Sequence, residues 1–488
     1  MEVQTIKTNQ GKVKIVVNDF LYIKNKNLTT SIRWECVRRR RDNCKATLKT
    51  DMNNQNPEII GDHSHAPSAT EVAVTKCRQT MKERARNTRE KPHQILAAEI
   101  EQLDHDTRAN IGNMATIQRD IQRHQRSQQP AEPAALADLV IADNWKVTKD
   151  GRPFLIHDSG EGVVNRIVVY ATEESLRLLA VARTWFIDGN FSMAPLIFKQ
   201  LYIIRAPLGN SAITCVYSFL PGKSELIYRE LFQAIVDTCE RLGFNVNPTH
   251  IISDFEISAI KATQHILGQH VVNKGCFYHL TQSTWRKIQS LGLTQLYKDR
   301  EDIRQFCGMI DGLAFLPIND IQAGLQYLQT LVDDELEPLL QYFDTNYVSG
   351  QYRRIQPPAL QRNNVLPPVV LRHVPPQFPP VMWNVREITL NNDHRTNNFC
   401  EAWNNGYFQL VGHKHPSFWS SIEAIRKDEA TSHVAILQDA IGNPPAKRIK
   451  RKSKDLQRRL RNLCLDHSQG RKNLQEFLTA IGHTIRLL

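Results

Sequence analysis

The sequence has no long apolar run, no even set of cysteines and no internal repeat. No apolar stretch approaches the roughly 18 residues that a membrane-spanning helix needs. The start of the sequence also lacks the apolar segment of a secretory signal. The nine cysteines are an odd number, and apart from a pair near the N-terminus they are scattered. We therefore expect a reducing intracellular compartment, in which cysteines bind metal or fill the core rather than form disulfides.

Positive charge exceeds negative charge, with 62 Lys and Arg against 50 Asp and Glu and a net charge of +12. The basic residues are clustered: Arg38 to Arg41 are consecutive, and KRIKRKSK occupies residues 447–454. A diffuse surface charge is the alternative, but clustering favours a polyanionic partner. The KRIKRKSK segment is also of the type found in nuclear localisation signals, so we expect the protein in the nucleus.

Residues 3–67 are predicted to form a small β-rich module that binds zinc. Two thiols and two imidazoles satisfy the tetrahedral coordination of zinc. A β-rich unit of this size has a small core and needs such a metal cross-link to be stable. Phe20, Tyr22 and Trp34 are the expected core of the module. The expected zinc ligands are Cys36, Cys44, His63 and His65.

The order of these residues resembles a FLYWCH zinc finger. The segment contains FLY at 20–22, WEC at 34–36, then Cys44 and a terminal HSH at 63–65. The resemblance implies binding of DNA or of protein and leaves open which of the two. The basic loop between the two cysteines can reach a phosphate backbone, although a merely solvated loop is the alternative. Its residues are Arg38, Arg39, Arg40 and Arg41.

Composition divides the remainder of the chain into segments. The stretch QRSQQPAEPA at 125–134 has the Pro and Gln content of a linker. Residues 281–345 have helical patterning throughout, and residues 350–382 are rich in proline. We expect a helical spacer and linker at 68–135, the first part of an α/β core at 136–290, a helical insertion with a Pro-rich loop at 291–394, a core helix at 395–440 and a basic C-terminal tail at 441–488.

The order of elements between 184 and 280 predicts the fold of the core. TWFIDGNF is a short strand, a hairpin turns at Gly209-Asn210, and a helix capped by Ser224 follows. THIISDFE is a further strand, ISAIKATQHILG a helix, and HVVNKGCFYHL a last β-rich run. This βββαβαβ order is that of an RNase H-like fold. The predicted fold class is therefore α/β, with an RNase H-like catalytic core, a helical insertion and a small β-rich zinc module before it.

Three carboxylates are the predicted catalytic residues. Asp188 and Asp254 end apolar β-rich runs, and Glu401 lies in a helix much further along the chain. Carboxylates from strand ends and a helix can hold two divalent cations about 4 Å apart, an arrangement that cuts and rejoins phosphodiester bonds. Magnesium suits such an all-oxygen site, and manganese can replace it. The competitors for the third position are Glu256, Glu387 and Asp393.

Several short motifs resemble the transposase domain of Mutator-like elements (the MULE superfamily). These are IDG at 187–189, SDFE at 253–256, CFYH at 276–279 and the helix that carries Glu401. The resemblance implies a DDE transposase in which the three acids bind two metal ions. It also marks Cys276 and His279 as a core motif, whose role in packing, in orienting the site or in a second zinc site stays open.

Together these features predict a transposase that binds DNA through its zinc finger and cleaves and joins strands with magnesium or manganese. The expected partners are double-stranded DNA with transposon ends and further copies of the chain on that DNA, with no membrane partner. The first alternative is a domesticated, catalytically inactive nuclear DNA-binding or chromatin protein. The second is an RNase H-type ribonuclease, which shares the metal chemistry but which the N-terminal finger and long insertion disfavour.

Overall fold

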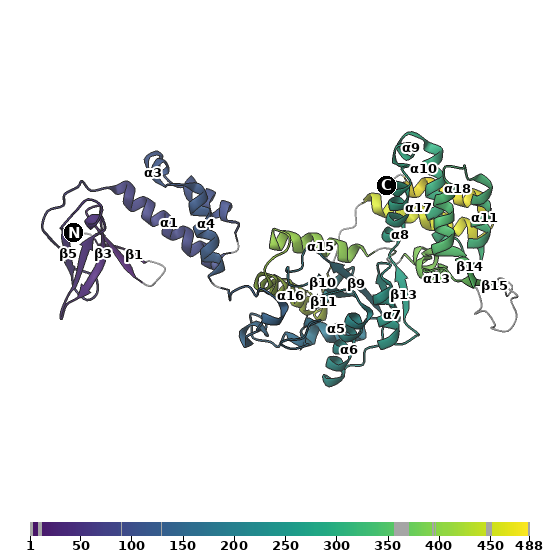
Figure 1. Ribbon diagram of the computed structural model, residues 1–488, viewed down its shortest axis with the longest axis horizontal. Coiled ribbons are helices and arrows are strands. Elements are labelled where there is room, and N and C mark those ends of the chain that lie inside the picture. The colour runs from purple at the N-terminus through teal and green to yellow at the C-terminus, as the bar shows by residue number, and fades with distance from the viewer. Residues whose placement is uncertain are drawn as a thin grey trace, which may run out of the picture. The chain divides into compact units, whose positions relative to one another are not determined.

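The computed structural model describes residues 3–486 except 8–11, 89, 128, 356–369, 393–394, 396 and 446–450. The chain divides into two compact units, Met1–Ala131 and Glu132–Leu488, each of which is described by itself (Figure 1). Among the helices of the described residues, none has the length and apolar character needed to span a bilayer.

The first unit begins with a six-stranded antiparallel sheet in which each strand pairs with the next. Asn18 and Asp19 form the two-residue turn between β2 and β3 with positive φ angles of 52° and 59°, which suits a tight hairpin. Tyr22 and Trp34 are buried as predicted, and the indole N–H of Trp34 donates to Oγ1 of Thr50 at 2.9 Å. The strands are β1 (Gln4–Lys7), β2 (Val13–Val17), β3 (Phe20–Asn27), β4 (Ile32–Cys36), β5 (Thr47–Thr50) and β6 (Glu58–Ile60).

Four helices complete the first unit. Ser68 caps the first of them, because its side chain accepts a hydrogen bond from the backbone N–H of Glu71. Met81, Ile95 and Ile121 are core residues that the helices share. Val72 packs against the sheet, so the segment predicted as a spacer is joined to the finger by apolar contact. The helices are α1 (Ala69–Asn87), α2 (Pro92–Glu101), α3 (His105–Asn110) and α4 (Met114–Arg126).

The second unit is built on a seven-stranded mixed sheet with the order β13-β12-β9-β10-β11-β8-β7. Strand β12 is parallel to β9 and to β13, and the other pairs are antiparallel. The predicted hairpin at Gly209-Asn210 is present, and Gly209 has a φ of +56°. The strands are β7 (Leu155–Asp158), β8 (Val168–Tyr170), β9 (Thr184–Asn190), β10 (Gln200–Leu208), β11 (Ser211–Leu220), β12 (His250–Ser253) and β13 (Val272–Gly275).

Helices cover both faces of this sheet (Figure 1). An apolar core lies on each face of the sheet, and alternate residues of β10 point into one or the other. Leu201 and Ile203 pack with α15 and α16, and Tyr202 and Ile204 pack with α5 and α6. Ser224 caps α6 as predicted, accepting from the N–H of Ile227. The α/β class and the β-rich N-terminal module are thereby confirmed. The helices are α5 (Glu173–Val181), α6 (Glu225–Arg241), α7 (Ile257–Ile266), α15 (Asn398–Val411) and α16 (Phe418–Ala440).

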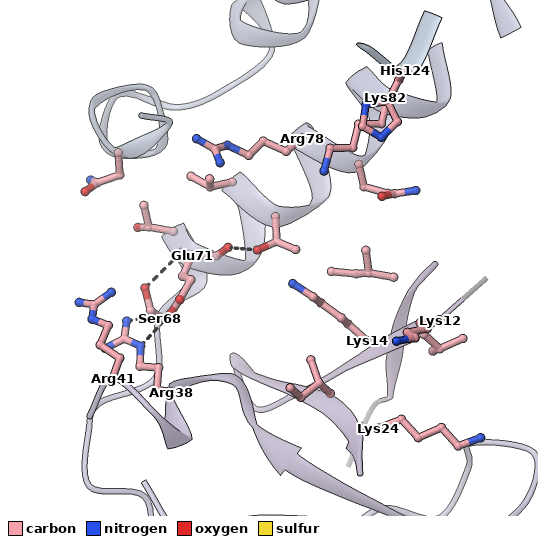
Figure 2. Close-up of a pocket in the computed structure, with 18 of the residues that line it drawn as sticks. Lys12, Lys14, Lys24, Arg38, Arg41, Ser68, Glu71, Arg78, Lys82 and His124 are labelled. Carbon is pink, nitrogen blue, oxygen red and sulfur yellow. Dashed lines mark hydrogen bonds and ion pairs between the residues drawn. The ribbon is translucent and has the colours of Figure 1, made fainter. Parts of the chain in front are cut away.

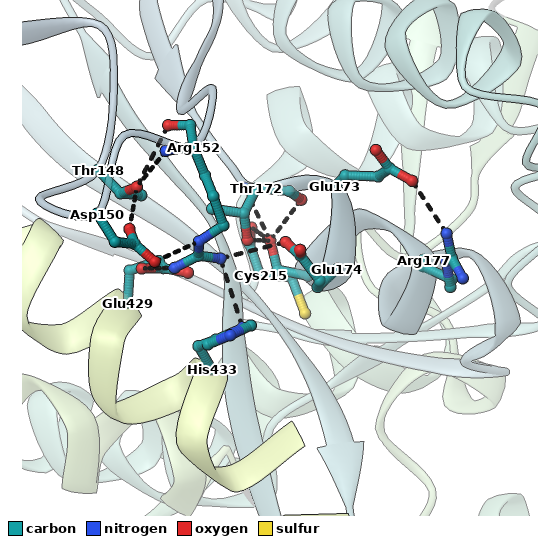
Figure 3. A network of polar contacts seen from close by, with 11 residues as sticks. Thr148, Asp150, Arg152, Thr172, Glu173, Glu174, Arg177, Cys215, Glu429 and His433 are labelled. Atoms are coloured by element: carbon teal, nitrogen blue, oxygen red, sulfur yellow. Dashed lines mark hydrogen bonds and ion pairs between the residues drawn. The ribbon is translucent and has the colours of Figure 1, made fainter. Parts of the chain in front are cut away.

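A polar network fastens α16 to the sheet region and to α5 (Figure 3). Arg152 donates to Asp150 at 2.8 Å, to Glu174 at 3.2 Å and to Glu429 at 3.0 Å. The Glu429 side chain on α16 is only 4% exposed, so the guanidinium compensates a charge that is costly to bury. Since α15 packs on α16, this network also supports the position of α15.

The remaining helices form a second, all-helical core, as the patterning of residues 281–345 predicts. Phe306 and Leu340 are buried there, whereas Leu331, the last residue of its helix, is 44% exposed. The Pro-rich stretch expected as a loop at 350–382 contains the paired strands β14 (Gln351–Ile355) and β15 (Val370–Val374). The helices are α8 (Phe277–Ser290), α9 (Thr294–Asp299), α10 (Glu301–Gly312), α11 (Ile321–Leu331), α12 (Glu337–Phe343), α13 (Pro380–Trp383) and α14 (Arg386–Leu390).

The segment expected as a basic C-terminal tail is folded. It contains α17 (Arg451–Ser468) and α18 (Leu474–Arg486), which lie among the helices of the insertion (Figure 1). Phe477 and Leu478 are fully buried, and Gly482 allows α18 to approach α10 closely, since a Cβ there would lie 2.8 Å from the backbone nitrogen of Met309. The many basic residues of this segment made the apolar face of its helices hard to recognise in the sequence. Of the predicted basic cluster, Lys447, Arg448 and Lys450 lie outside the described residues.

Candidate functional site

The four predicted zinc ligands lie together in the first unit. Their ligand atoms are all within 4.8 Å of one another, and Cys36, Cys44, His63 and His65 are the one such cluster of Cys, His, Asp or Glu among the described residues. Strand β4 ends at Cys36, and the two histidines follow β6. The sheet therefore brings together residues that are up to 29 positions apart.

The spacing of the donor atoms suits tetrahedral zinc. Sγ of Cys36 is 3.2 Å from Nε2 of His65, and Sγ of Cys44 is 3.3 Å from Nδ1 of His63. The two ring nitrogens are 3.4 Å apart. Bonds of about 2.3 Å to sulfur and about 2.0 Å to nitrogen separate tetrahedral donors by roughly 3.3 to 3.8 Å. The site needs little rearrangement to accept the ion.

Each imidazole also has a partner for its second nitrogen. Nε2 of His63 lies 2.8 Å from the hydroxyl of Tyr22, and Nδ1 of His65 lies 3.0 Å from the carbonyl oxygen of Ala66. Such partners fix the tautomer that leaves the other nitrogen free for a metal. The ring of Phe20 stacks on His63 with a centroid distance of 3.6 Å. Two of the aromatic residues in the sequence pattern thus orient a zinc ligand.

The two thiols have different surroundings. Burial raises the pKa of Cys36 to about 11. Burial also acts to raise the pKa of Cys44, but backbone hydrogen bonds from Ser64 and Ala46 outweigh it and leave that pKa lowered. Burial lowers the pKa of His63, and the neighbouring His65 lowers it further, which keeps the ring neutral. Neutral imidazole and thiolate are the forms that bind zinc.

The predicted DNA-binding arginines have unequal surroundings. Arg38 donates to Oε2 of Glu71 on α1 through Nε at 2.9 Å and Nη2 at 2.7 Å, and its Nη1 donates to Asp42 at 3.2 Å. It therefore ties the finger to α1. Arg39, Arg40 and Arg41 are exposed. Their contact with DNA stays a prediction.

In the second unit, Asp188 lies in β9, and Asp254 directly follows β12, the parallel neighbour of β9. The register pairs His250 with Thr184 and Ile252 with Phe186. Asp188 comes two residues after Phe186, and Asp254 comes two residues after Ile252. The carboxylates are close enough to interact: burial raises the pKa of Asp188, and the charge of Asp254 raises it further. The sheet thus brings the first two predicted acids to one edge.

Asparagines of α15 hold this helix over the same edge. Nδ2 of Asn397 donates to the carbonyl oxygen of Ile187 at 2.9 Å. Nδ2 of Asn404 donates to Oδ2 of Asp188 at 2.7 Å, and its Oδ1 accepts from Asn190 at 2.9 Å. The Asn-rich pattern around α15 thereby acquires a structural reason, and the contribution of Asn190 was not foreseen.

Glu401 lies one helical turn before Asn404 and therefore on the same face of α15. Burial raises its pKa; the imidazole of His279 acts in the opposite direction, and the charge of Asp188 raises it. Oε1 of Glu401 is buried and has no hydrogen-bond partner among the described residues. This carboxylate therefore has a free acceptor at the edge that carries Asp188.

Cys276 and His279 stand at the start of α8 rather than in a strand, because β13 ends at Gly275. Sγ of Cys276 accepts a hydrogen bond from the backbone N–H of Asn397 at 3.1 Å, which fixes the entry to α15. The imidazole of His279 influences the pKa of both Asp188 and Glu401. No third ligand joins these two residues in a zinc-type cluster within the described part of the chain.

The competing carboxylates have other surroundings. Glu256 accepts a hydrogen bond from the hydroxyl of Tyr228 at 2.9 Å and lies 3.5 Å from Nζ of Lys223. Glu387 belongs to α14, in the helical part of the unit. Asp393 lies outside the described residues. The assignment of the third acid to Glu401 stays a prediction.

The geometry of the first unit defines a small β-sheet module whose cluster of two cysteines and two histidines could bind zinc. Comparison with known families agrees: the model of the FLYWCH zinc finger domain matches residues 5–65. The first unit thus contains a FLYWCH zinc finger, a domain that suggests binding of DNA or protein. No match was found among curated proteins. The family match ends before the second unit, so the resemblance of that unit to a transposase stays a prediction.

Proposed function

We propose that the protein is a DNA transposase, which recognises DNA through its FLYWCH finger and cleaves and joins strands at the sheet edge of the second unit. The observation that carries the proposal is the register of β9 and β12, which brings Asp188 and Asp254 to the same level beneath the helix that carries Glu401. Acids delivered in this way suit phosphoryl transfer with divalent cations.

The strand order supports an RNase H-like core. From β9 onward the chain forms an antiparallel meander, β9 to β11, and then adds β12 and β13 parallel to β9 on the other side. Asp188 lies within the first of these five strands, and Asp254 directly follows the fourth. This is the arrangement that the βββαβαβ order predicts.

The surroundings of the acids fit a divalent cation. Burial and neighbouring negative charge raise the pKa of Asp188 and of Glu401, and Oε1 of Glu401 has no partner among the described residues. Asp188, Asp254 and Glu401 would hold magnesium or manganese, which would activate the attacking oxygen and stabilise the leaving one. The protein's own contribution is to orient Asp188 through Asn404 and to keep the acids at one edge.

The test is cleavage of labelled DNA that carries the ends of the encoding element, with the purified full-length chain. We expect strand cleavage in magnesium or manganese and none after chelation. An Asp254→Asn variant should bind the DNA but leave it intact. If the wild-type chain binds these ends and never cleaves them, the inactive nuclear DNA-binding protein becomes the better description. Cleavage of RNA in RNA–DNA hybrids, with no cleavage of DNA, would favour the ribonuclease.

A further inference from the structure

The first unit contains an open groove of about 1370 Å³ between the finger sheet and helices α1 and α4 (Figure 2). Its lining is strongly basic: nine of the lining residues are Lys or Arg, and Glu71 is the one acid among them. Lys12, Lys14 and Lys24 come from the sheet side, and Arg78 and Lys82 come from α1. Basic side chains therefore line both walls of the groove.

The acid in the groove is already neutralised. Both Nε and Nη2 of Arg38 donate to Oε2 of Glu71. By contrast, Lys14 and Lys82 form no ion pair with a carboxylate of the described residues. Burial lowers the pKa of Lys14, and the positive charge of Lys82 lowers it further, although the charge of Glu71 acts in the opposite direction. The fold therefore holds like charges near one another, and a polyanion would relieve their repulsion.

The walls of the groove are fixed to one another. Val72 of α1 packs in one apolar cluster with Ile6 and Leu21 of the sheet. The N–H of Ser68 donates to the carbonyl oxygen of Asp19 at 3.1 Å. Arg78 is also held, since Nη2 donates to the carbonyl oxygen of Ile111 at 2.6 Å. A surface held in this way loses little conformational freedom when it binds.

From this groove we infer that the DNA-binding surface of the first unit is formed jointly by the finger and helices α1 and α4, which together bind the phosphate backbone of duplex DNA. Lysines on two walls of an open groove match the charges that run along a duplex. The lining contains no Phe, Tyr or Trp, so it offers no stacking platform for single-stranded bases. In this account Arg38 maintains the groove and does not contact phosphate.

The inference rests on the proposed function, because it assumes that the finger binds DNA. The groove variant Lys12→Gln/Lys14→Gln/Lys82→Gln of the full-length chain tests it. Binding of a short labelled duplex is measured between about 50 and 200 mM KCl. The slope of log affinity against log salt should flatten by about 0.9 for each lost phosphate contact. The matched control is Lys26→Gln/Lys45→Gln/Lys49→Gln, which removes the same charge from exposed finger positions outside the groove and should keep the wild-type slope.

Zinc content and the thermal unfolding midpoint establish that both variants are folded. If the groove variant keeps the wild-type slope while Arg39→Ala/Arg40→Ala, at two exposed positions outside the groove, flattens it, the groove is not the DNA surface, although the proposed function stands. If the wild-type chain binds no duplex, the proposed function and the inference both fail. A further arm replaces DNA by poly-glutamate: groove-dependent binding of that peptide without binding of duplex overturns the choice of DNA.

Discussion

Removal of zinc, or a Cys36→Ser substitution, is expected to unfold the N-terminal sheet while the second unit keeps its structure. The apolar core of this sheet is small, and its fully enclosed members include Tyr22, Trp34 and Leu48. A core of this size supplies little free energy of folding, whereas a structural zinc contributes about 10 kcal/mol or more in comparable modules. Hydrogen exchange of residues 13–50 in the full-length chain, followed by mass spectrometry, measures the effect.

A matched control is available in the same unit. Cys77 of α1 is buried, 6% exposed, and lies outside the metal cluster. A Cys77→Ser variant should keep its zinc and the exchange protection of the sheet. Persistence of slow exchange in β2 to β5 after zinc has been removed completely would show that the sheet does not depend on the metal.

Replacing Glu401 by glutamine is expected to reduce magnesium-dependent DNA cleavage by about a thousandfold or more. The substitution preserves shape but removes a charged metal ligand, and loss of roughly 4 kcal/mol of transition-state stabilisation corresponds to that factor. DNA affinity should change little, because the FLYWCH module lies in the other unit. The measurement is the single-turnover rate of cleavage at saturating protein.

Glu387→Gln is the matched control, because it makes the same chemical change at the competing glutamate on α14. This variant should retain cleavage close to the wild-type rate. If Glu387→Gln abolishes cleavage and Glu401→Gln does not, the third acid has been assigned to the wrong helix. The reaction class would survive that result, since Asp188 and Asp254 remain in register.

The zinc module was predictable because its ligands and aromatic residues are local in sequence and chemically specific. The sheet edge was predictable in part: an apolar run in the sequence that ends in Asp188 or Asp254 has a recognisable pattern, and parallel neighbouring strands align their ends. The hydrogen bonds of Asn404 and Asn397 to this edge join residues more than 200 positions apart. Patterning alone could identify the helix but not its contacts.

Other features depend on tertiary packing and left weaker signals. The basic groove joins Lys14 of a strand to Lys82 of a helix, and neither residue belongs to a charge run. Arg38 does belong to one, yet it forms an internal ion pair with Glu71. The helices of the presumed tail were missed because their many basic residues conceal the apolar spacing of Leu460 and Cys464. In each case, the spacing of charged residues along the sequence differs from their arrangement in the folded structure.

The most direct test of the proposed transposase is strand transfer. A labelled DNA fragment that ends in the precut terminus of the element is incubated with the full-length chain, magnesium and a circular target plasmid. The account predicts covalent joining of the labelled strand to the plasmid, and loss of the joined product with Asp254→Asn. Hydrolysis of the fragment without any joined product, or joining that persists in Asp254→Asn, would contradict it.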